Sequence, residues 1–311
     1  MIILQVVLLA VGFFLLVKGA DWFVDGSSGI ADRLGIPQLV IGLTIVAMGT
    51  SAPETAVSIT AALGGNADIA VGNVVGSNIL NILIILGISS VITSIAVAKT
   101  TIRYEIPIML FISFLLLFFG MTDGLIVLWE GIVLLLCFAL YILYMFVMIK
   151  KGEMQSEALE SQQKPVWKLI LASVIGLALI IIGSKVTVNA ATTIAQKIGI
   201  SEKFIGLTVV ALGTSLPELF TSVIAARKGN ADIAIGNIVG SNIFNILFVL
   251  GTSALIVPVP FETGFVVDCL VSVAAGVILW LCVFRKKKLK RIDGIIMLLS
   301  YGFYFAYLLI K

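Results

Sequence analysis

Two glutamates in matching motifs are the residues best suited to chemistry in this chain. Glu54 ends the motif GTSAPE, Glu218 ends the motif GTSLPE, and each lies deep inside a long apolar stretch. An isolated carboxylate at the centre of a lipid bilayer costs at least about 2.5–3.5 kcal/mol, so such a residue is functional by default. No lysine or arginine lies at that depth to pair with either glutamate. We therefore expect both glutamates to bind cations.

The residues just before each glutamate supply further oxygen atoms. The hydroxyl groups are those of Thr50, Ser51, Thr214 and Ser215. A spacing of four places threonine and glutamate on one helix face. The proline between them cannot donate a hydrogen bond, which frees the carbonyl groups of Gly49 and Gly213. Open turns inside a membrane are tolerated only where they face a cavity or a ligand. An all-oxygen set of this kind suits hard cations such as Ca²⁺ and Na⁺.

A second polar stripe follows each motif along the chain. Its members are spaced by four and are Asn73, Ser77, Asn81, Asn237, Ser241 and Asn245. Residues at this spacing line one face of a helix. We expect the serines and the later asparagines (Ser77, Asn81, Ser241, Asn245) to face the ion site. For Asn73 and Asn237, a hydrogen bond between helices is as good an interpretation as a ligand role.

The elements that must position these residues are membrane helices. Of the 311 residues, 60% are hydrophobic and 12% are charged, whereas an average soluble domain carries about 25% charged residues. Apolar runs of about 20 residues, the length of a membrane span, recur from end to end. We expect an all-α polytopic membrane protein with ten spans, at residues 2–20, 37–63, 69–93, 103–121, 124–149, 167–186, 204–227, 233–257, 264–284 and 292–310.

This composition excludes several functional classes. The spans leave no room for a soluble enzyme domain, and the chain has no histidine for zinc hydrolysis or nucleophilic catalysis. The three cysteines, Cys137, Cys269 and Cys282, stand singly in apolar stretches and form no metal-binding spacing. The net charge of +3 arises from loop residues, which membrane orientation explains better than nucleic-acid binding. We predict that the protein is not an enzyme.

The sequence repeats itself once. Residues 41–92 align with residues 205–256 without a gap, at an offset of 164 and with 34 identities in 52 positions. A repeat this strong implies two structurally equivalent halves. We place the first half at 1–149, a linker at 150–166 and the second half at 167–311. Each half holds five spans, so the second must be inverted in the membrane, an arrangement typical of secondary transporters.

The basic residues predict how the chain is oriented. With the N-terminus outside, 16 of the 20 lysines and arginines fall on the cytoplasmic side and 4 on the external side. The four external residues are Lys185, Lys197, Lys203 and Lys311. We expect all 20 basic residues to lie in loops or at span ends. We also expect both termini outside, the 150–166 loop inside, and the first apolar segment to be retained as a helix.

The pair GTSAPE…GNVVGSNILNI and GTSLPE…GNIVGSNIFNI resembles the two alpha repeats of the sodium/calcium exchanger family, most of all its compact prokaryotic members. The resemblance covers the whole chain. It implies ion sites between the second, third, seventh and eighth helices. The residues it assigns to them are Glu54, Glu218, Thr50, Ser51, Thr214, Ser215, Ser77, Ser241, Asn81 and Asn245, with the carbonyl groups of Ala47 and Ala211. Asn245 stands where potassium-dependent relatives have aspartate, which argues against potassium cotransport.

The function expected from this resemblance is exchange of three Na⁺ for one Ca²⁺ across the cell membrane by alternating access. An H⁺/Ca²⁺ antiporter using the same two glutamates is the alternative, and a cation channel is a more remote one. The expected partners are the two transported ions and membrane lipid, without a cofactor or nucleic acid, and the protein is expected to work as a monomer. The first and sixth helices lack midplane ligands, so we expect them to slide or rock against the rest.

Overall fold

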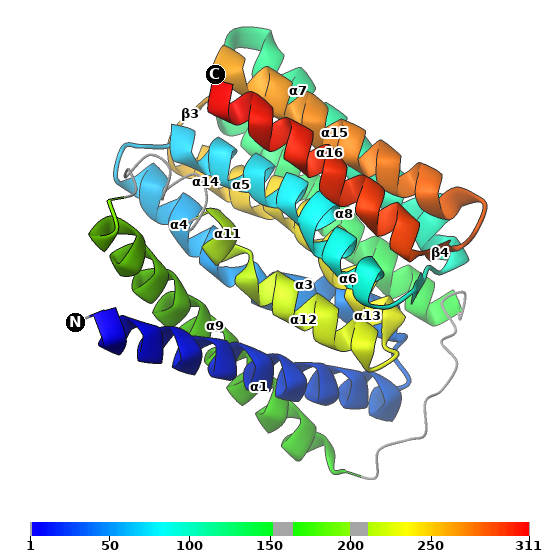
Figure 1. The fold of residues 1–311 in the computed structure, drawn as a ribbon. Helices are drawn as coiled ribbons and strands as arrows, with labels where there is room; N and C mark the ends of the chain where they lie inside the picture. Colours follow the sequence, from blue (N-terminus) through cyan, green and yellow to red (C-terminus); the bar gives the residue numbers. More distant parts are fainter. Residues whose placement is uncertain (1, 152–163, 200–210, 311) are drawn as a thin grey trace.

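The structure is a computed structural model that describes residues 2–151, 164–199 and 211–310. Nearly all of these residues are helical (Figure 1). The long helices are α1 (Ile2–Leu34), α7 (Ile106–Asp123), α8 (Leu128–Lys151), α9 (Val166–Lys197), α15 (Thr263–Phe284) and α16 (Arg291–Ile310). The repeated segments are built from shorter pieces.

The pieces follow the same order in both repeats where both are described. In the first they are α2 (Gln38–Ile41), η1 (Gly42–Val46), α3 (Ala47–Thr50), α4 (Ala52–Leu63), α5 (Asp68–Leu80), η2 (Asn81–Leu86) and α6 (Gly87–Ile92). In the second they are α11 (Ala211–Thr214), α12 (Leu216–Arg227), α13 (Ala231–Phe244), η5 (Asn245–Leu250) and α14 (Gly251–Ile256). The η segments are π-helical turns, and another, η3 (Thr101–Glu105), precedes α7.

The helices have the length and hydropathy of membrane spans. Within the described residues, 8 helices can cross a membrane, or 9 if the bent pair of residues 38–50 and 52–63 forms one span. The remaining predicted span, 204–227, corresponds to α11 and α12, and its residues 204–210 lie outside the described part of the chain. Large apolar side chains such as Phe14, Phe146 and Phe303 are exposed, as expected of surfaces that face lipid. The protein is a polytopic helical membrane protein.

Two predicted spans are wrong in their ends. We expected 2–20 and 167–186, but α1 runs to Leu34 and α9 to Lys197. The prediction ended both spans near their charged residues, yet these helices continue as 33- and 32-residue rods. Lys185 consequently lies within α9, 12 residues before its end. Lys18 likewise lies within α1, 16 residues before its end. The expectation that every basic residue lies in a loop or at a span end is therefore wrong for Lys18 and Lys185.

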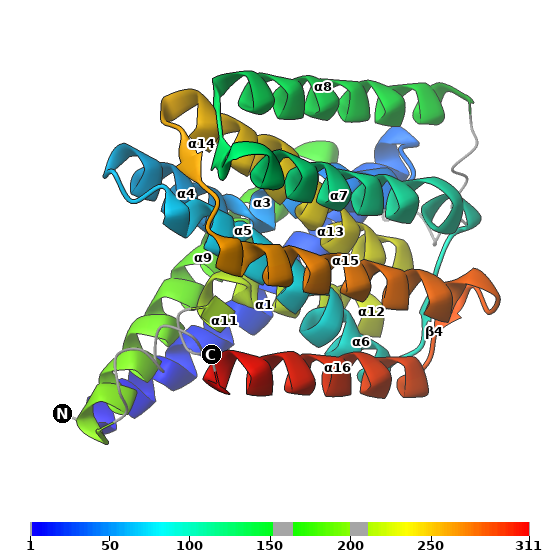
Figure 2. The same ribbon diagram turned by 90° about the horizontal axis from the view of Figure 1, so that it is seen from above.

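The long helices α1 and α9 pack side by side along one flank of the molecule (Figure 1). Glycines permit this close approach, because a Cβ atom at Gly19 would lie 2.8 Å from the carbonyl oxygen of Gly176. On the opposite flank, α7, α8, α15 and α16 run as nearly parallel rods (Figure 2). The repeated segments lie between these two flanks.

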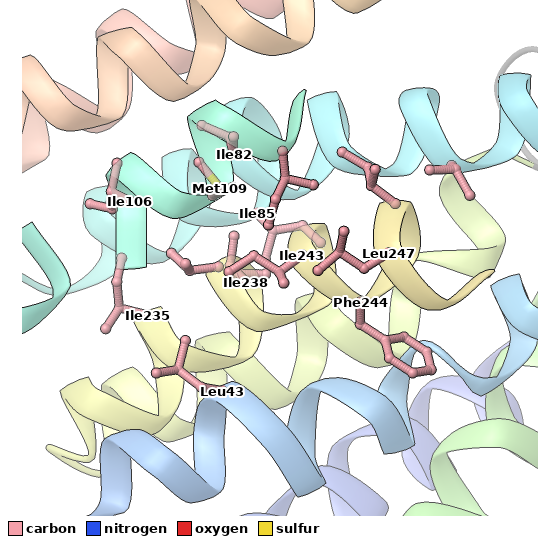
Figure 3. Close-up of a cluster of buried hydrophobic side chains, with 14 of the residues drawn as sticks. Leu43, Ile82, Ile85, Ile106, Met109, Ile235, Ile238, Ile243, Phe244 and Leu247 are labelled. Carbon is pink, nitrogen blue, oxygen red and sulfur yellow. The ribbon is translucent and has the colours of Figure 1, made fainter. Parts of the chain in front are cut away.

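The centre of the molecule is an apolar core around α13. Every residue from Ile233 to Phe244 is buried, and apolar side chains from η1, η2 and α7 converge on this helix (Figure 3). Burial from all sides explains why α13 shows no amphipathic pattern, since a helix that is apolar all round is a central one. The core therefore holds the polar residues of the repeats at a fixed depth.

Two short strand pairs tie the ends of the bundle together. β1 (Ile95–Ala96) pairs antiparallel with β4 (Lys288–Leu289), and β2 (Leu125–Ile126) pairs antiparallel with β3 (Val259–Pro260). β1 and β3 occupy matching positions of the repeat, 164 residues apart. Each pair therefore joins a loop of the first half to a loop of the second.

Candidate cation-binding site

Both GTSxPE motifs break their helix at the serine. The chain bends by 48° between residues 38–50 and 52–63, and Ser51 between them leaves the helical conformation with φ −81° and ψ 11°. Ser215 separates α11 from α12 with nearly the same angles, φ −87° and ψ 5°. The broken turns predicted from the prolines are therefore present in both repeats. Each break puts a serine and a glutamate at the start of a new helix.

The two glutamates are buried, and each is held by the serine of the other motif. The Ser51 hydroxyl donates to Oε1 of Glu218 at 2.8 Å, and the Ser215 hydroxyl donates to Oε1 of Glu54 at 3.4 Å. Both glutamate side chains are 1% exposed. The second carboxylate oxygen, Oε2, is buried and has no hydrogen-bond partner in either residue. The crossed pairing brings both carboxylates into one site.

Four asparagines join the two repeats beside this site. The side chains of Asn78 and Asn242 each donate to the main-chain carbonyl group of the other residue at 3.1 Å. Asn81 Nδ2 donates to Oδ1 of Asn242 at 2.9 Å, and Asn245 Nδ2 donates to Oδ1 of Asn78 at 3.1 Å. Every bond has a counterpart in the other repeat. This leaves Oδ1 of Asn81 and of Asn245 buried and without a partner.

The four unpartnered oxygen atoms come from elements that contact one another. The α12 helix of Glu218 packs against η2, which begins at Asn81, and the α4 helix of Glu54 packs against η5, which begins at Asn245. The asparagines thus stand where an α-helix changes to a π-helical turn, a feature often found at functional sites. The site offers two carboxylate and two amide oxygen atoms for a cation.

The asparagines at 73 and 237 fasten helices to each other. Asn73 donates to the carbonyl oxygen of Glu54 at 3.1 Å and to the hydroxyl of Ser58 at 2.9 Å. Asn237 makes the same two bonds to Glu218 and Ser222, at 3.4 and 2.9 Å. These bonds fix the helix that carries each glutamate, so the structure favours the helix-to-helix interpretation left open by the sequence.

Where the structure describes them, the other predicted ligands are buried or line a cavity. Thr50 is buried and its hydroxyl lies 2.9 Å from Oδ1 of Asn237. The Ser241 hydroxyl donates to the carbonyl group of Ala47 at 3.4 Å, and Ser77 is buried on α5. Thr214 lines a cavity described below. Ala211 begins α11 next to residues 200–210, and its side chain lies outside the described part.

One predicted free carbonyl group is not free. We expected the carbonyl of Gly213 to be free and to face a cavity or a ligand. Gly213 does line a cavity, but its carbonyl accepts a hydrogen bond from the Ser184 hydroxyl of α9 at 2.7 Å. The proline opens the turn as predicted, and a hydroxyl of a neighbouring helix then supplies the missing donor. Residue types within one helix could not reveal this bond, because the donor lies 29 positions away.

Sequence reasoning missed four residues of the network. They are Asn78, Asn242, Ser58 and Ser222, all buried. A signal for them was present, because all four are identical between the repeats and lie in apolar surroundings. The spacing rule of four selected Asn73, Ser77 and Asn81 and passed over Asn78, which follows Ser77 directly. Most residues of α5 are buried, so more than one face of this helix is available to the site.

The candidate site is rich in neutral oxygen atoms and poor in charge. Among the described residues there is no group of three or more His, Cys, Asp or Glu side chains that could hold a metal ion. A cation held here would therefore use the two carboxylates together with hydroxyl, amide and carbonyl oxygen atoms. Such a shell is typical of Ca²⁺ and other hard cations.

A cavity of about 710 Å³ extends from the site towards one end of the molecule. It lies between α4, α9 and α11, with Pro53 and Thr214 at the broken turns and Gly64 and Asn66 near the end of α4. Lys185 of α9 also lines it. The cavity thus connects the two broken turns with the end of α4.

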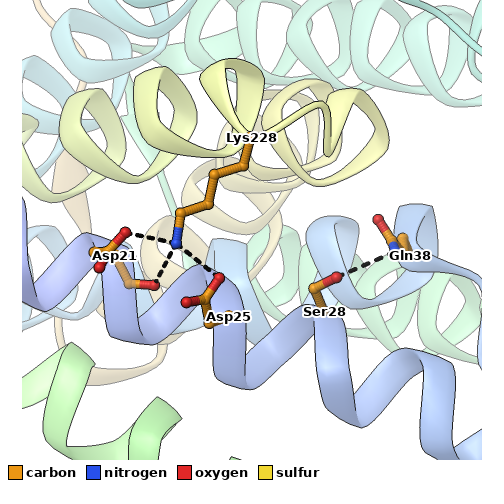
Figure 4. Close-up of polar contacts among 5 residues, drawn as sticks. All are labelled: Asp21, Asp25, Ser28, Gln38 and Lys228. Atoms are coloured by element: carbon orange, nitrogen blue, oxygen red, sulfur yellow. Dashed lines mark hydrogen bonds and ion pairs between the residues drawn. The ribbon is translucent and has the colours of Figure 1, made fainter. Parts of the chain in front are cut away.

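A second cavity of about 390 Å³ lies at matching positions in the other repeat, between α1 and α12. Here Lys228 Nζ contacts Oδ1 of Asp21 at 2.5 Å and Oδ1 of Asp25 at 2.7 Å (Figure 4). The same ammonium group donates to the carbonyl oxygen of Asp21 at 3.2 Å. Burial acts to lower the pKa of Lys228, but its bonds to both aspartates outweigh burial and raise the pKa above the ordinary lysine value. This ion pair ties α1 to the end of α12.

Comparisons with known proteins agree with this arrangement. The family model described as sodium/calcium exchanger protein matches residues 4–147 and 168–310. The putative antiporter CaxA of Alkalimonas amylolytica is 43% identical over 301 residues, covering 94% of each chain. The sodium/calcium exchanger MaX1 of Methanosarcina acetivorans is 33% identical over 356 residues, covering 100% of this chain and 99% of its own.

Solved structures of the sodium-calcium exchanger NCX_Mj share the fold. The crystal soaked with 2.5 mM Na⁺ and 10 mM Sr²⁺ superposes with a TM-score of 0.85 at 36% identity, covering 98% of this chain and 99% of the other. Family match, full-length relatives and common fold all agree with the motif resemblance in the sequence. The chain therefore belongs to the sodium/calcium exchanger protein family.

Proposed function

We propose that the protein is a secondary active antiporter that exchanges three Na⁺ for one Ca²⁺ by alternating access. One observation carries the proposal: four buried acceptor oxygen atoms, on Glu54, Glu218, Asn81 and Asn245, have no hydrogen-bond donor. Leaving a buried acceptor unpaired costs about 1–3 kcal/mol, and a bound cation removes that cost. Relatives such as MaX1 and NCX_Mj are named sodium/calcium exchangers, which supports Na⁺ and Ca²⁺ as the transported ions.

The ligand set of the proposal has two kinds of member. Glu54 and Glu218 supply the negative charge. The neutral oxygen atoms come from Thr50, Ser51, Thr214, Ser215, Ser77, Ser241, Asn81, Asn245 and the carbonyl groups of Ala47 and Ala211. The ions are substrates, and the proposal includes no resident cofactor and no covalent step.

The charge of the site explains why transport would be an exchange. With both carboxylates ionised, the empty site carries about −2 charges, which are costly to carry through a low-dielectric barrier. One Ca²⁺, or two to three Na⁺, offsets this charge. The loaded protein can therefore change its access, whereas the empty protein is held back. After the protein releases one kind of ion, it must bind the other kind before the site can face the first side of the membrane again.

The membrane arrangement is part of the proposal. We place the inverted halves at 1–149 and 167–311 with the linker 150–166 in the cytoplasm and both termini outside. The matching order of elements and the crossed hydrogen bonds at the centre support two equivalent halves. The distribution of lysines and arginines is the basis for the proposed orientation. We propose that a monomer in the lipid bilayer is the working unit, because both glutamates and all four asparagines of the site belong to one chain.

The test is transport by purified protein in lipid vesicles. Vesicles loaded with Na⁺ should take up radioactive Ca²⁺ when diluted into Na⁺-free medium, and Glu54→Gln or Glu218→Gln should abolish this uptake. Glu262→Gln is the matched control, because Glu262 is exposed and lies before α15. Measuring the voltage at which net flux vanishes then gives the stoichiometry, since three-for-one exchange moves one charge per cycle.

Two results would contradict the proposal and identify a different transport function. Uptake that follows a pH gradient and ignores the Na⁺ gradient would identify an H⁺/Ca²⁺ antiporter using the same glutamates. Ca²⁺ flux that needs no counter-ion would identify a channel. Normal uptake by both glutamine variants would show that the site lies elsewhere.

A further inference from the structure

Lys185 places a positive charge in the cavity that adjoins the candidate cation site. It lines the 710 Å³ cavity together with Thr214, which belongs to the candidate site. Among the described residues that line this cavity, Lys185 is the charged one. Its side chain is exposed although it lies well inside α9. Within the described part of the chain, no carboxylate lies within ion-pair distance of its ammonium group.

The matching position in the first repeat carries the opposite charge. Residue 185 corresponds to Asp21 at the offset of 164, and Gly64 corresponds to Lys228. In the second cavity the basic residue Lys228 forms an ion pair with Asp21. In the first cavity, glycine replaces that basic residue, and the position of the acidic partner is taken by Lys185. Within the described part of the chain, the positive charge of Lys185 in the first cavity is therefore not neutralised, whereas the charge of Asp21 is neutralised by Lys228.

A fixed charge in such a cavity separates ions by valence. The Coulomb energy between two charges is proportional to their product, so Lys185 repels Ca²⁺ with twice the energy with which it repels Na⁺ at the same point. Apolar walls strengthen the effect, because a cavity with low-dielectric walls focuses the field of its charges. The pocket's walls are largely apolar side chains such as Val57, Ile69 and Val188.

We propose that Lys185 is a selectivity-determining residue that disfavours Ca²⁺ relative to Na⁺ on the side reached through this cavity. The proposal rests on the exchange function proposed above. It predicts a quantitative relation, because the exponent of the repulsion scales with ion charge. Removing the charge should change the half-saturating concentration of Ca²⁺ by the square of the factor found for Na⁺.

The experiment measures exchange in vesicles at low ionic strength, with the ion concentration varied on each side in turn. Lys185→Gln should lower the half-saturating Ca²⁺ concentration roughly tenfold and that of Na⁺ roughly threefold, on one side of the membrane only. Lys185→Arg keeps the charge and should match the wild type. Raising the ionic strength with an inert salt should shrink both effects, because salt screens the ammonium group.

A chemical variant separates charge from folding. Lys185→Cys can be labelled in the folded protein with methanethiosulfonate reagents that carry a positive, neutral or negative group. The positive label should restore wild-type selectivity, and the neutral and negative labels should favour Ca²⁺ progressively more. Treating the wild type with the same reagents controls for its own three cysteines.

The outcomes distinguish this inference from the function on which it rests. A wild type without Na⁺-driven Ca²⁺ uptake overturns both. A wild type that exchanges normally, with equal factors for Ca²⁺ and Na⁺ in Lys185→Gln, or with Lys185→Arg behaving like Lys185→Gln, overturns the role of Lys185 alone.

Discussion

The cavity beside α4 and the cavity beside α12 occupy matching positions of one sequence repeat, yet they differ in size and charge. The first measures about 710 Å³ and the second about 390 Å³. Lys228 bonds to Asp21 and Asp25 at the second cavity, whereas Gly64 and Lys185 face the first. The centre between them is nearly symmetric, with paired bonds from both repeats. The two repeats therefore have the same residues and bonds at the centre of the molecule. They differ at the two cavities, each of which lies beside one repeat.

The largest expected effect concerns the symmetric centre. Glu54→Gln and Glu218→Gln should each lower Na⁺-driven Ca²⁺ uptake by at least about 100-fold, because each removes one of the two charges that we propose hold a divalent ion. Equal losses are expected, since each carboxylate is bonded by the serine of the other motif. Initial rates of Ca²⁺ uptake at saturating Na⁺ gradients measure both losses. If one of the two variants kept the wild-type rate, the two glutamates would not be equivalent.

A smaller effect should follow from cutting the asparagine link. Asn78→Ala removes a donor to Asn242 and an acceptor for Asn245, so the free energy of unfolding should fall by about 1–3 kcal/mol. Asn242→Ala removes the mirror-image bonds and should cost the same within error. Unfolding of each variant in detergent measures the loss. Clearly unequal losses would show that the centre is less symmetric than its hydrogen bonds suggest.

The ion pair at the second cavity should contribute less. Its groups are partly exposed, so Lys228→Met should weaken the attachment of α1 to the end of α12 by about 1 kcal/mol or less. A cysteine placed at Val223, which lines this cavity, should react up to about fivefold faster with a water-soluble thiol reagent in the Lys228→Met protein. A cysteine at Val57, which lines the first cavity, is the matched control and should not speed up.

An ion pair equivalent to that of Lys228 and Asp21 can be introduced at the first cavity. The double variant Gly64→Lys, Lys185→Asp copies the second cavity into the first, where Gly64 has an ordinary helical φ of −83°. The reaction of a cysteine at Val57 should slow by up to about fivefold, because the new pair ties α9 to the end of α4. Lys185→Asp alone lacks the partner and should not slow it. An unchanged rate in the double variant would show that charge does not set the difference between the cavities.

The smallest effect is expected from pH. Because the pKa of Lys228 is raised by its aspartate partners, the ion pair contributes its full stabilisation below the ordinary lysine pKa of about 10.4 and loses it only as pH rises through the raised value. Thiol reactivity at Val223, corrected for ionisation of the thiol, should therefore stay flat between about pH 6 and pH 9. A steep increase in thiol reactivity between about pH 6 and pH 9 would contradict the prediction. It would show that Lys228 loses its proton below the ordinary lysine pKa.

Part of the fold and of the site could be read from the residues. Apolar runs located the membrane helices, because the bilayer fixes their length and composition. The end of α1 was misplaced, because a charged residue such as Asp21 can lie inside a helix when a lysine from another part of the chain pairs with it. The end of α9 was misplaced because Lys185 lies inside the helix on an exposed face beside a cavity. Asn78 was passed over because helical spacing identifies one face, whereas a central helix uses several.

The sequence alone determined the membrane class, the duplicated motifs and the oxygen-rich set of candidate ligands, since each follows from residue type and short-range spacing. Only the tertiary structure decided that Ser51 bonds to Glu218 of the other repeat, that Gly213 is capped by Ser184, and that one cavity is larger while Lys228 pins the other. The physical reason is that helical periodicity fixes which side chains share a face of their own helix. Which helix meets that face depends on how the helices pack.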